Sequence, residues 1–244
     1  MAAPTVANTP SASYKVENVV TGAIATFGGS THTSSGGDDR CLVAVIAARS
    51  NIGTSRTLTT LTWNGVTMSK DAEQRHSDSA GIGTTITICT LNDPAAATAG
   101  AISATYSGTI EHAQIWFYDV EGCPNGIADT FAVDVDDASG DTAVSISISP
   151  TVEDTLCIMG VTQLSSSVIY TFSPLTINDQ KITATETLDS AIASGVLASS
   201  GAQNVTATLS GANEFSAAAI TLAGAEDEPT ARWQRMGLSI GIGL

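Results

Sequence analysis

The chain is short of charged residues, and of lysine above all. Charged side chains make up 14% of its 244 residues, well below the roughly 25% of an average soluble domain. The formal charge of −15 comes from 24 acidic against 9 basic residues, and the lysines are Lys15, Lys70 and Lys181. Because an anionic protein repels phosphate groups, this balance argues against a nucleic-acid or anionic-membrane partner.

Targeting signals are also missing. The first fifteen residues hold neither the basic nor the apolar segment of a signal peptide, and no apolar run reaches the length of a membrane span. We therefore expect synthesis in the cytoplasm without secretion, and no membrane partner.

Paired cysteines are absent as well. Cys41, Cys89, Cys123 and Cys157 are far apart and form no CxxC pair, which argues against a zinc site or a redox dithiol. Three of them lie inside apolar runs. Buried thiols that act as small hydrophobic residues are the main interpretation, and a disulfide remains the alternative.

The surface that replaces the charged residues is rich in Ser, Thr, Gly and Ala. Such short side chains lose little entropy when a neighbouring subunit covers them, which suits permanent packing in an assembly. An ordinary acidic β-domain explains the composition equally well.

The hydrophobic pattern is that of strands almost throughout. Residues 41–48 form a continuous apolar run, as expected for a strand buried on both faces, and residues 85–91 alternate isoleucine with smaller side chains. Further strands are expected at residues 101–106, 113–120, 144–148, 155–161, 205–209 and 217–222. Residues 69–77 are the one segment for which we expect a short helical turn.

The strongest turn signal is Asn64-Gly65, between apolar residues 58–63 and 66–68. This dipeptide takes the two positive φ angles of a type I′ turn more easily than others. A tight β-hairpin is therefore expected there.

The sequence also contains an internal echo. The matching pairs are residues 104–108 (ATYSG) with 207–211 (ATLSG), 111–112 with 214–215 at the same offset, and 39–43 with 154–158 at a slightly longer offset. Two copies are too few for a solenoid. We expect two related halves that contribute to one sandwich with a single fused core, and two abutting sandwiches are the alternative.

Many short strands without alternating helices favour an all-β fold, an antiparallel β-sandwich or jelly roll with two related halves. The expected division is an N-terminal arm at residues 1–15, the β-sandwich at 16–224, an acidic linker at 225–229 and an extended C-terminal tail at 230–244.

No catalytic motif stands in a supporting context. Residues 237–241 match G-x-S-x-G, but the chain continues only to Leu244, whereas a nucleophile elbow needs a helix and its partner residues downstream. His32, His76 and His112 lie far upstream. We expect no enzymatic activity, no catalytic residue and no cofactor.

Two further groups of residues permit a functional interpretation. Asp134, Asp136, Asp137 and Asp141 offer carboxylates for Ca²⁺, but the EF-hand glycine and glutamate are missing, so an acidic turn capped by its own side chains is favoured and no metal site is assigned. The aromatic residues in 115–118 (IWFY) would suit sugar stacking in a lectin, although core packing explains them better.

The order of these signals resembles a family of β-sandwich structural proteins of tailed-bacteriophage and prophage particles. The resemblance runs through residues 16–224, and the segments that carry it are 39–48, 61–68, 86–94, 99–122 and 215–220. These are strand and turn signals without a catalytic signature. The resemblance implies a fold and a location in the virion after synthesis in the host cytoplasm.

The functional hypothesis is a virion structural protein: a decoration, head-fibre or tail-associated protein whose partners are copies of itself and other virion proteins. The alternative is a carbohydrate-binding adhesin module on a virion or cell surface, with a surface glycan as its partner.

The C-terminal tail is the candidate assembly interface. Its residues for this role are Arg232, Trp233, Arg235, Met236, Leu238, Ile240, Ile242 and Leu244. The last four alternate with small residues, as in a strand with one apolar face, which suits pairing with a sheet edge. Folding back onto the tail's own sandwich is the alternative.

Overall fold

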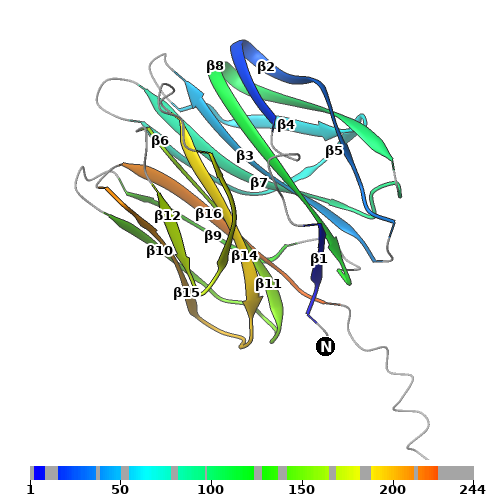
Figure 1. Cartoon of the computed structure of the whole chain (residues 1–244), viewed down its shortest axis with the longest axis vertical. Helices are drawn as coiled ribbons and strands as arrows, with labels where there is room; N and C mark the ends of the chain where they lie inside the picture. The colour runs from blue at the N-terminus through cyan, green and yellow to red at the C-terminus, as the bar shows by residue number, and fades with distance from the viewer. Residues whose placement is uncertain are drawn as a thin grey trace, which may run out of the picture.

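The computed structural model describes residues 3–8, 16–36, 39–50, 55–77, 82–96, 98–123, 128–136, 142–164, 169–181, 188–211 and 214–224. Within these ranges every regular element is a strand (Figure 1). All pairings between those strands are antiparallel. The all-β class expected from the sequence is therefore confirmed.

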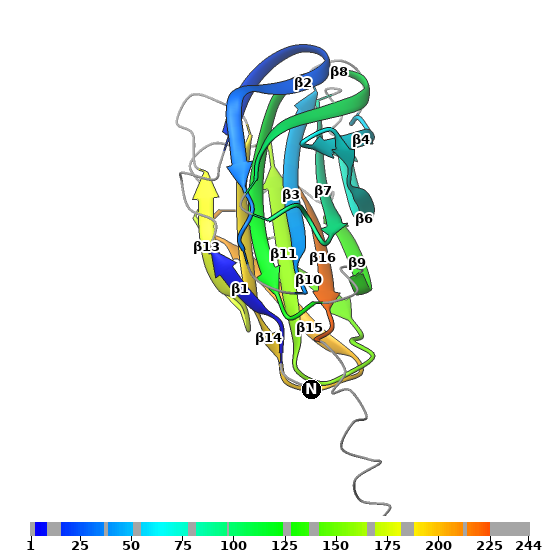
Figure 2. The same cartoon turned by 90° about the vertical axis from the view of Figure 1, so that its right-hand side faces the viewer.

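The first half of the chain forms one eight-stranded sheet. Its strands are β1 (Thr5–Asn8), β2 (Val16–Thr33), β3 (Cys41–Ser50), β4 (Leu58–Trp63), β5 (Val66–Thr67), β6 (Ser69–Ser77), β7 (Gly83–Asn92) and β8 (Ala99–Glu121). They lie in the order β5-β4-β8-β3-β7-β6, and β1 and β2 also pair with β8. The first part of β8 pairs with β4 and its last part with β3. Because β2 and β8 arch over together (Figure 2), the sheet curls around its own core and is nearly closed.

The second half forms two smaller sheets. Its strands are β9 (Ala128–Asp136), β10 (Ala143–Ile148), β11 (Thr155–Gln163), β12 (Tyr170–Ser173), β13 (Thr176–Lys181), β14 (Asp189–Leu197), β15 (Gln203–Leu209) and β16 (Phe215–Leu222). One sheet has the order β13-β14-β11-β16-β9 and the other β10-β15-β12. The five-stranded sheet lies between the three-stranded sheet and the first half, since its two faces contribute to different cores.

Three clusters of buried side chains fill the molecule. The first core lies inside the curled sheet, and the second core lies between the two small sheets. The shared core joins the halves and comprises Cys41, Val43, Val45, Ala47, Ala72, Ile86, Ile88, Trp116, Tyr118, Val120 and Cys123 with Leu156, Ile158, Ile192, Ala218, Ile220 and Leu222. Burial of both faces explains the continuous apolar runs of β3, β7, β11 and β16.

Local sequence signals account for several elements. Asn64 and Gly65 have φ angles of 50° and 76°, which confirms the tight hairpin that joins β4 to β5. In β10 the burial alternates strictly between exposed and buried residues, as a strand with one solvent face requires.

The expected helical turn at residues 69–77 is wrong, because this segment is strand β6. β6 pairs with β7 along its length, with a bulge between Lys70 and Ala72. Without β6, the inner strand β7 would leave its N–H and C=O groups unpaired, so tertiary pairing overrides the weak helix propensity of the segment.

All four cysteines are buried, and none of them forms a disulfide. Burial raises the pKa of the Cys157 thiol to about 12 and also raises that of Cys89. Neither thiol is therefore a thiolate nucleophile at neutral pH. The interpretation of the cysteines as small hydrophobic residues is confirmed.

The linker at residues 225–229 and the tail at 230–244 lie outside the described residues. Of the N-terminal arm, β1 pairs with the end of β8, where Val6 faces Val120. The body at residues 16–224 as one sandwich stays a prediction.

Candidate functional site

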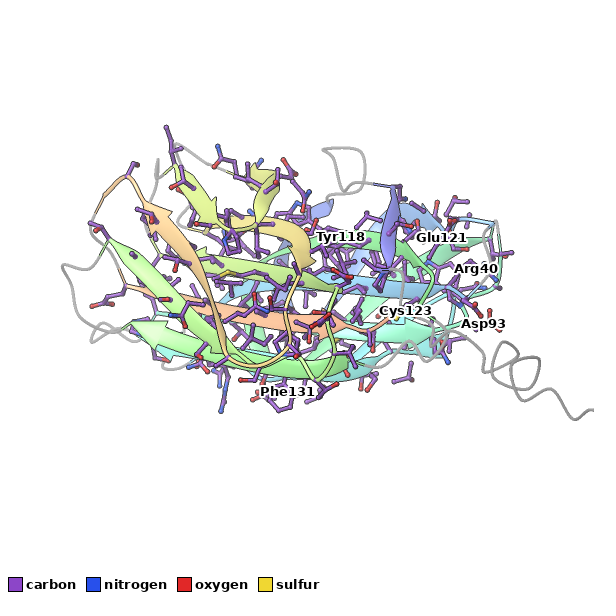
Figure 3. All side chains as sticks on the ribbon, turned by 90° about the horizontal axis from the view of Figure 1, so that it is seen from below. Arg40, Asp93, Tyr118, Glu121, Cys123 and Phe131 are labelled. Atoms are coloured by element: carbon purple, nitrogen blue, oxygen red, sulfur yellow. The ribbon has the colours of Figure 1, made fainter. Side chains whose placement is uncertain are left out.

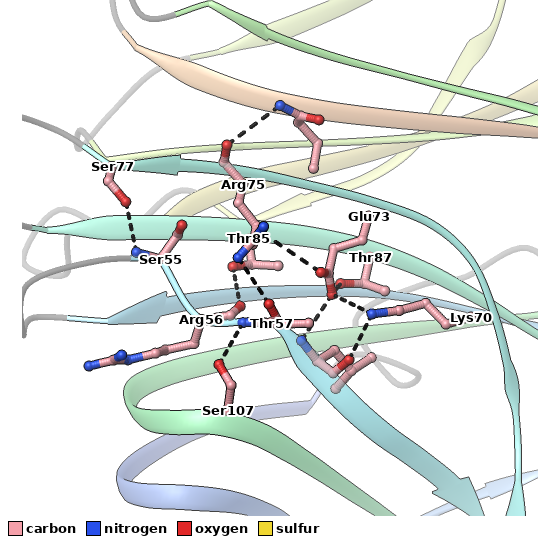
Figure 4. A network of polar contacts seen from close by, with 12 residues as sticks. Ser55, Arg56, Thr57, Lys70, Glu73, Arg75, Ser77, Thr85, Thr87 and Ser107 are labelled. Atoms are coloured by element: carbon pink, nitrogen blue, oxygen red, sulfur yellow. Dashed lines mark hydrogen bonds and ion pairs between the residues drawn. The ribbon is translucent and has the colours of Figure 1, made fainter.

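A polar cleft lies beside β6 in the first half. It has a volume of about 470 Å³ and is lined by Ser55, Glu73, Gln74, Arg75 and Ser77. Glu73, Arg75 and Ser77 are two residues apart, so the strand presents them on one face. Figure 4 shows how these side chains meet the segment that leads into β4.

Glu73 is the centre of the cleft's hydrogen-bond network. Its Oε2 accepts hydrogen bonds from the backbone N–H of Leu58 at 2.9 Å and the hydroxyl of Thr87 at 3.3 Å, and it lies 3.4 Å from Nζ of Lys70. Its Oε1 lies 3.9 Å from Nε of Arg75. The carboxylate therefore already has structural partners, and no general-base role is assigned to it.

The segment before β4 is fastened to its surroundings by backbone and hydroxyl groups (Figure 4). Ser55 N–H donates to Oγ of Ser77 at 2.7 Å. The Thr85 hydroxyl donates to the Arg56 carbonyl at 2.6 Å, and Nη1 of Arg75 donates to Oγ1 of Thr57 at 3.0 Å. These bonds hold the rim of the cleft in place.

The cleft's size falls within the range of small-molecule sites, roughly 300 to 1,000 Å³. Its lining offers hydroxyl, amide and guanidinium groups but no aromatic ring. This chemistry suits a small polar ligand held by hydrogen bonds.

Exposed apolar side chains mark a second kind of surface, the strand edges. The large exposed apolar residues are Ile24, Val66, Phe131, Ile169, Ile177 and Val196. Val66 lies on β5, Phe131 on β9 and Ile177 on β13, and each of these strands is at the end of its sheet. Ile169 directly precedes β12, another edge strand.

Phe131 is the most exposed of these residues, with 63% of its surface accessible. It points away from the body in Figure 3 and pairs on its inner side with Ile220 of β16. β9 also contains Asp134 and Asp136. β9 is the last strand of its sheet, although β6 and β10 lie close to it. An edge strand with an apolar side chain outside is able to accept a further strand where its edge is open.

A buried polar cluster ties the N-terminal strand to the body. His32 Nε2 lies 3.0 Å from Oδ2 of Asp119, and the His32 ring stacks on Phe117 with 4.7 Å between ring centroids. Asn8 donates to the same Asp119 oxygen at 2.6 Å and accepts from the Asp119 N–H at 2.9 Å. Because the His32 and Asp119 side chains are only 2% and 3% exposed, this cluster positions β1 and offers no access to a substrate.

The sequence-predicted interface residues lie outside the described part of the chain. These are Arg232, Trp233, Arg235, Met236, Leu238, Ile240, Ile242 and Leu244. Of the acidic turn, Asp134 and Asp136 belong to β9, while Asp137 and Asp141 lie outside that part as well. Among the described residues, no group of three or more His, Cys, Asp or Glu is placed to hold a metal ion.

The aromatic residues of 115–118 are core residues. Trp116, Phe117 and Tyr118 are at most 1% exposed. Trp116 Nε1 donates to Oδ2 of Asp179 at 3.0 Å, and the Tyr118 hydroxyl donates to Oδ1 of Asn178 at 2.9 Å. The packing interpretation is confirmed, so these rings are not a sugar-stacking platform.

The cleft is not apparent from the sequence, because the composition of residues 69–77 favours a helical turn. In a helix, residues 73, 75 and 77 face different directions, whereas in a strand they share a face. The polar and charged residues at every second position of that segment are the sequence feature that indicates a strand with one polar face. In the described residues, no helix is long and apolar enough to cross a membrane.

Comparison with known proteins returned no matching family model, no matching curated protein and no matching solved structure.

Proposed function

We propose that this protein is a structural component of a particle, in the leading form a tailed-bacteriophage virion. In this role it self-associates or binds a capsid or tail lattice, as a decoration, head-fibre or tail-associated protein. Its body is a sandwich or jelly roll of two related halves, and residues 230–244 are its assembly arm. The supporting observation is the set of apolar side chains exposed along edge strands.

Edge strands are natural docking points because their outer N–H and C=O groups are free to pair with another chain. Natural monomers usually block such edges with lysine or proline. β9 contains neither, although it carries three aspartates, and it presents Phe131 to solvent. An edge of this kind supports a role in association.

The tail is a suitable occupant for such an edge. Leu238, Ile240, Ile242 and Leu244 alternate with small residues, which suits strand addition. Arg232 and Arg235 would meet a body that carries most of the chain's 24 acidic residues. Charge complementarity then guides the arm of one copy to the body of the next.

Deletion of residues 232–244 tests this proposal. We expect the truncated chain to keep the circular dichroism spectrum of a β-protein, because the described core lies in residues 16–224. Sedimentation velocity should show smaller species than the full chain forms. A truncated chain that associates as the full chain does would contradict the assembly role.

Two point variants locate the docking edge. Phe131→Lys places a charge on β9, and we expect it to weaken association as the deletion does. Val196→Lys is the matched control, because Val196 is 50% exposed but lies on β14, which is inside its sheet. Equal effects of both variants would place the docking site elsewhere.

The polar cleft favours the second candidate function, a carbohydrate-binding adhesin module. Ser55, Gln74 and Arg75 offer the hydrogen-bonding groups that sugar hydroxyls need, although no ring is present to stack on the sugar. A chain that stays monomeric at all concentrations and binds a glycan array through Arg75 would favour this function over assembly.

A further inference from the structure

The strand orders of the two halves match one another. In the first half, β6-β7-β3-β8 is continued by the start of β2, and in the second half β13-β14-β11-β16 is continued by β9. Likewise, the row of β4, the first part of β8 and the later part of β2 corresponds to β12-β15-β10. β2 and β8 are each continuous, while their counterparts are divided into two strands.

A bulge fixes the register of this correspondence. The ladder between β6 and β7 skips Asp71, and the ladder between β13 and β14 skips Asn178. Counting across the sheets from the bulges gives two equivalent rows of paired residues: Ala72, Ile88, Val45 and Trp116 in the first half, and Asp179, Ile192, Gly160 and Ala218 in the second.

The echoed serines make the same contacts in both halves. Ser107 N–H donates to the carbonyl of Thr57 at 2.9 Å, and its hydroxyl accepts from the Thr57 N–H at 3.1 Å. Ser210 does the same with Ile169, at 2.9 Å and 3.0 Å. Each serine fastens the residue that precedes the outer strand β4 or β12.

The residue pairs next to these serines are exchanged between the halves. Leu58 faces Tyr106 in the first half, and Tyr170 faces Leu209 in the second. Each pair therefore consists of one leucine and one tyrosine, but the leucine lies on the outer strand in the first half and on the inner strand in the second. The two halves therefore agree in packing as well as in strand order.

Across the shared core, the strand pairs that meet are reciprocal, although β6 and β7 lie closer to β16 than β13 and β14 lie to β8. β6 packs on β16, which is the counterpart of β8. In return β8 contacts β13, the counterpart of β6, through the Trp116–Asp179 and Tyr118–Asn178 hydrogen bonds. β3 packs on its own counterpart β11. A contact in which element i meets j while j meets i is the mark of a two-fold interface.

The centre of the interface is a residue that faces its own equivalent. A Cβ atom on Gly160 would lie 2.6 Å from Cγ1 of Val45 and 3.0 Å from Cδ1 of Ile86. Val45 and Gly160 hold the same position in the two rows. Only one side chain fits at this point, and the first half supplies it.

We propose that the shared core is an interface of the homodimer type between two copies of one β-unit that are joined in a single chain, with Val45 and Gly160 on its pseudo-two-fold axis. The partner for which each half's inner sheet is shaped is a second copy of the same unit.

Exchange of the two axial residues in the full chain tests the proposal. Gly160→Val should lower the melting temperature by about 5 °C or more, because the added methyl groups meet Val45 and Ile86. Val45→Gly should lower it as well, through the lost side chain. The double variant V45G/G160V should melt clearly above G160V and above V45G, because the single side chain then enters the same space from the other half.

The control is V45G/A191V, which restores the same volume in the second core instead of on the axis. It should not melt above V45G. If G160V does not fold, recovery of folded protein in V45G/G160V supports the proposal just as well. A double variant no better than G160V, or a G160V variant as stable as the parent, would overturn it.

Discussion

Asp71 and Asn178 occupy the same bulge in the two halves, yet only Asp71 has an acidic side chain there. Burial raises the pKa of Asp71 above its ordinary value, although the hydroxyls of Thr90 and Ser69 oppose the shift. Among the described residues, none is a hydrogen-bond partner of its Oδ2 atom. Asn178 instead accepts, through Oδ1, a hydrogen bond from the hydroxyl of Tyr118. The charge at Asp71 is therefore a local cost that the second half avoids.

Asp71→Asn should raise stability at neutral pH. Because the pKa is higher in the folded state, the wild-type chain loses stability as pH rises from about 4. That loss is complete above the raised pKa, and the amide variant does not undergo it. We expect a higher urea midpoint for the variant at pH 7 and a shrinking difference below about pH 4.

Asp93→Asn is the control, because the Asp93 side chain is 80% exposed and lies 3.3 Å from Arg40. That variant should gain nothing at pH 7. Equal midpoints for Asp71→Asn and the parent at neutral pH would show that the Asp71 charge is well solvated.

Among the elements, the β4–β5 hairpin depends on the backbone conformation of its two turn residues, Asn64 and Gly65. Gly65 has a φ of 76°, which L-residues adopt only with strain. Gly65→Ala should cost about 1 to 2 kcal/mol in the free energy of unfolding. Urea titration measures this loss.

Gly36→Ala is its matched control. Like Gly65, Gly36 has open space around an added Cβ atom, but its φ is not in the positive region. We expect a change within about 0.5 kcal/mol. If both variants lose the same stability, backbone strain at Gly65 is not the cause.

The pairing of whole strands also corrects the alignment of the two halves. Residues 104–108 correspond to residues 207–211, as the sequence predicts. Further along the strand, Trp116 corresponds to Ala218, one residue earlier than the same spacing would give. The alignment of His112 with Phe215 is therefore wrong, and His112 corresponds to Glu214. A one-residue slip turns every side chain to the opposite face, so the pairing of β8 with β3 settles the register.

At the scale of the molecule, the shared core makes each half part of the other's support. Trp116 and Tyr118 are 0% exposed, and both lie against residues of the second half. Separation of the halves would expose the whole shared core to water. Because neither half can keep this core buried alone, we expect the two halves to unfold together, as one cooperative unit.

Limited proteolysis tests this cooperativity. Cleavage between Cys123 and Thr142 should not release two folded halves, because each would expose its inner sheet. Calorimetry of the intact chain should show one transition. Recovery of two protease-resistant fragments, each with its own melting transition, would falsify the prediction.

Sequence patterns alone indicated many of the strands, among them residues 41–48, 85–91 and 155–161, together with the Asn64-Gly65 turn and the buried thiols. These features depend on side-chain period and local backbone preference, which neighbouring residues specify. The same patterns gave no sign of β1, β2, β9 and β12 to β14. An apolar run such as residues 41–48 also shows that both faces of a strand are covered. Long-range strand pairing set the even-numbered residues of β3 against the first core and the odd-numbered ones against the shared core. It likewise decided that residues 69–77 form a strand and that Glu73 and Arg75 line a cleft with Ser55, because distant strands supply the hydrogen bonds and contacts on which these outcomes depend.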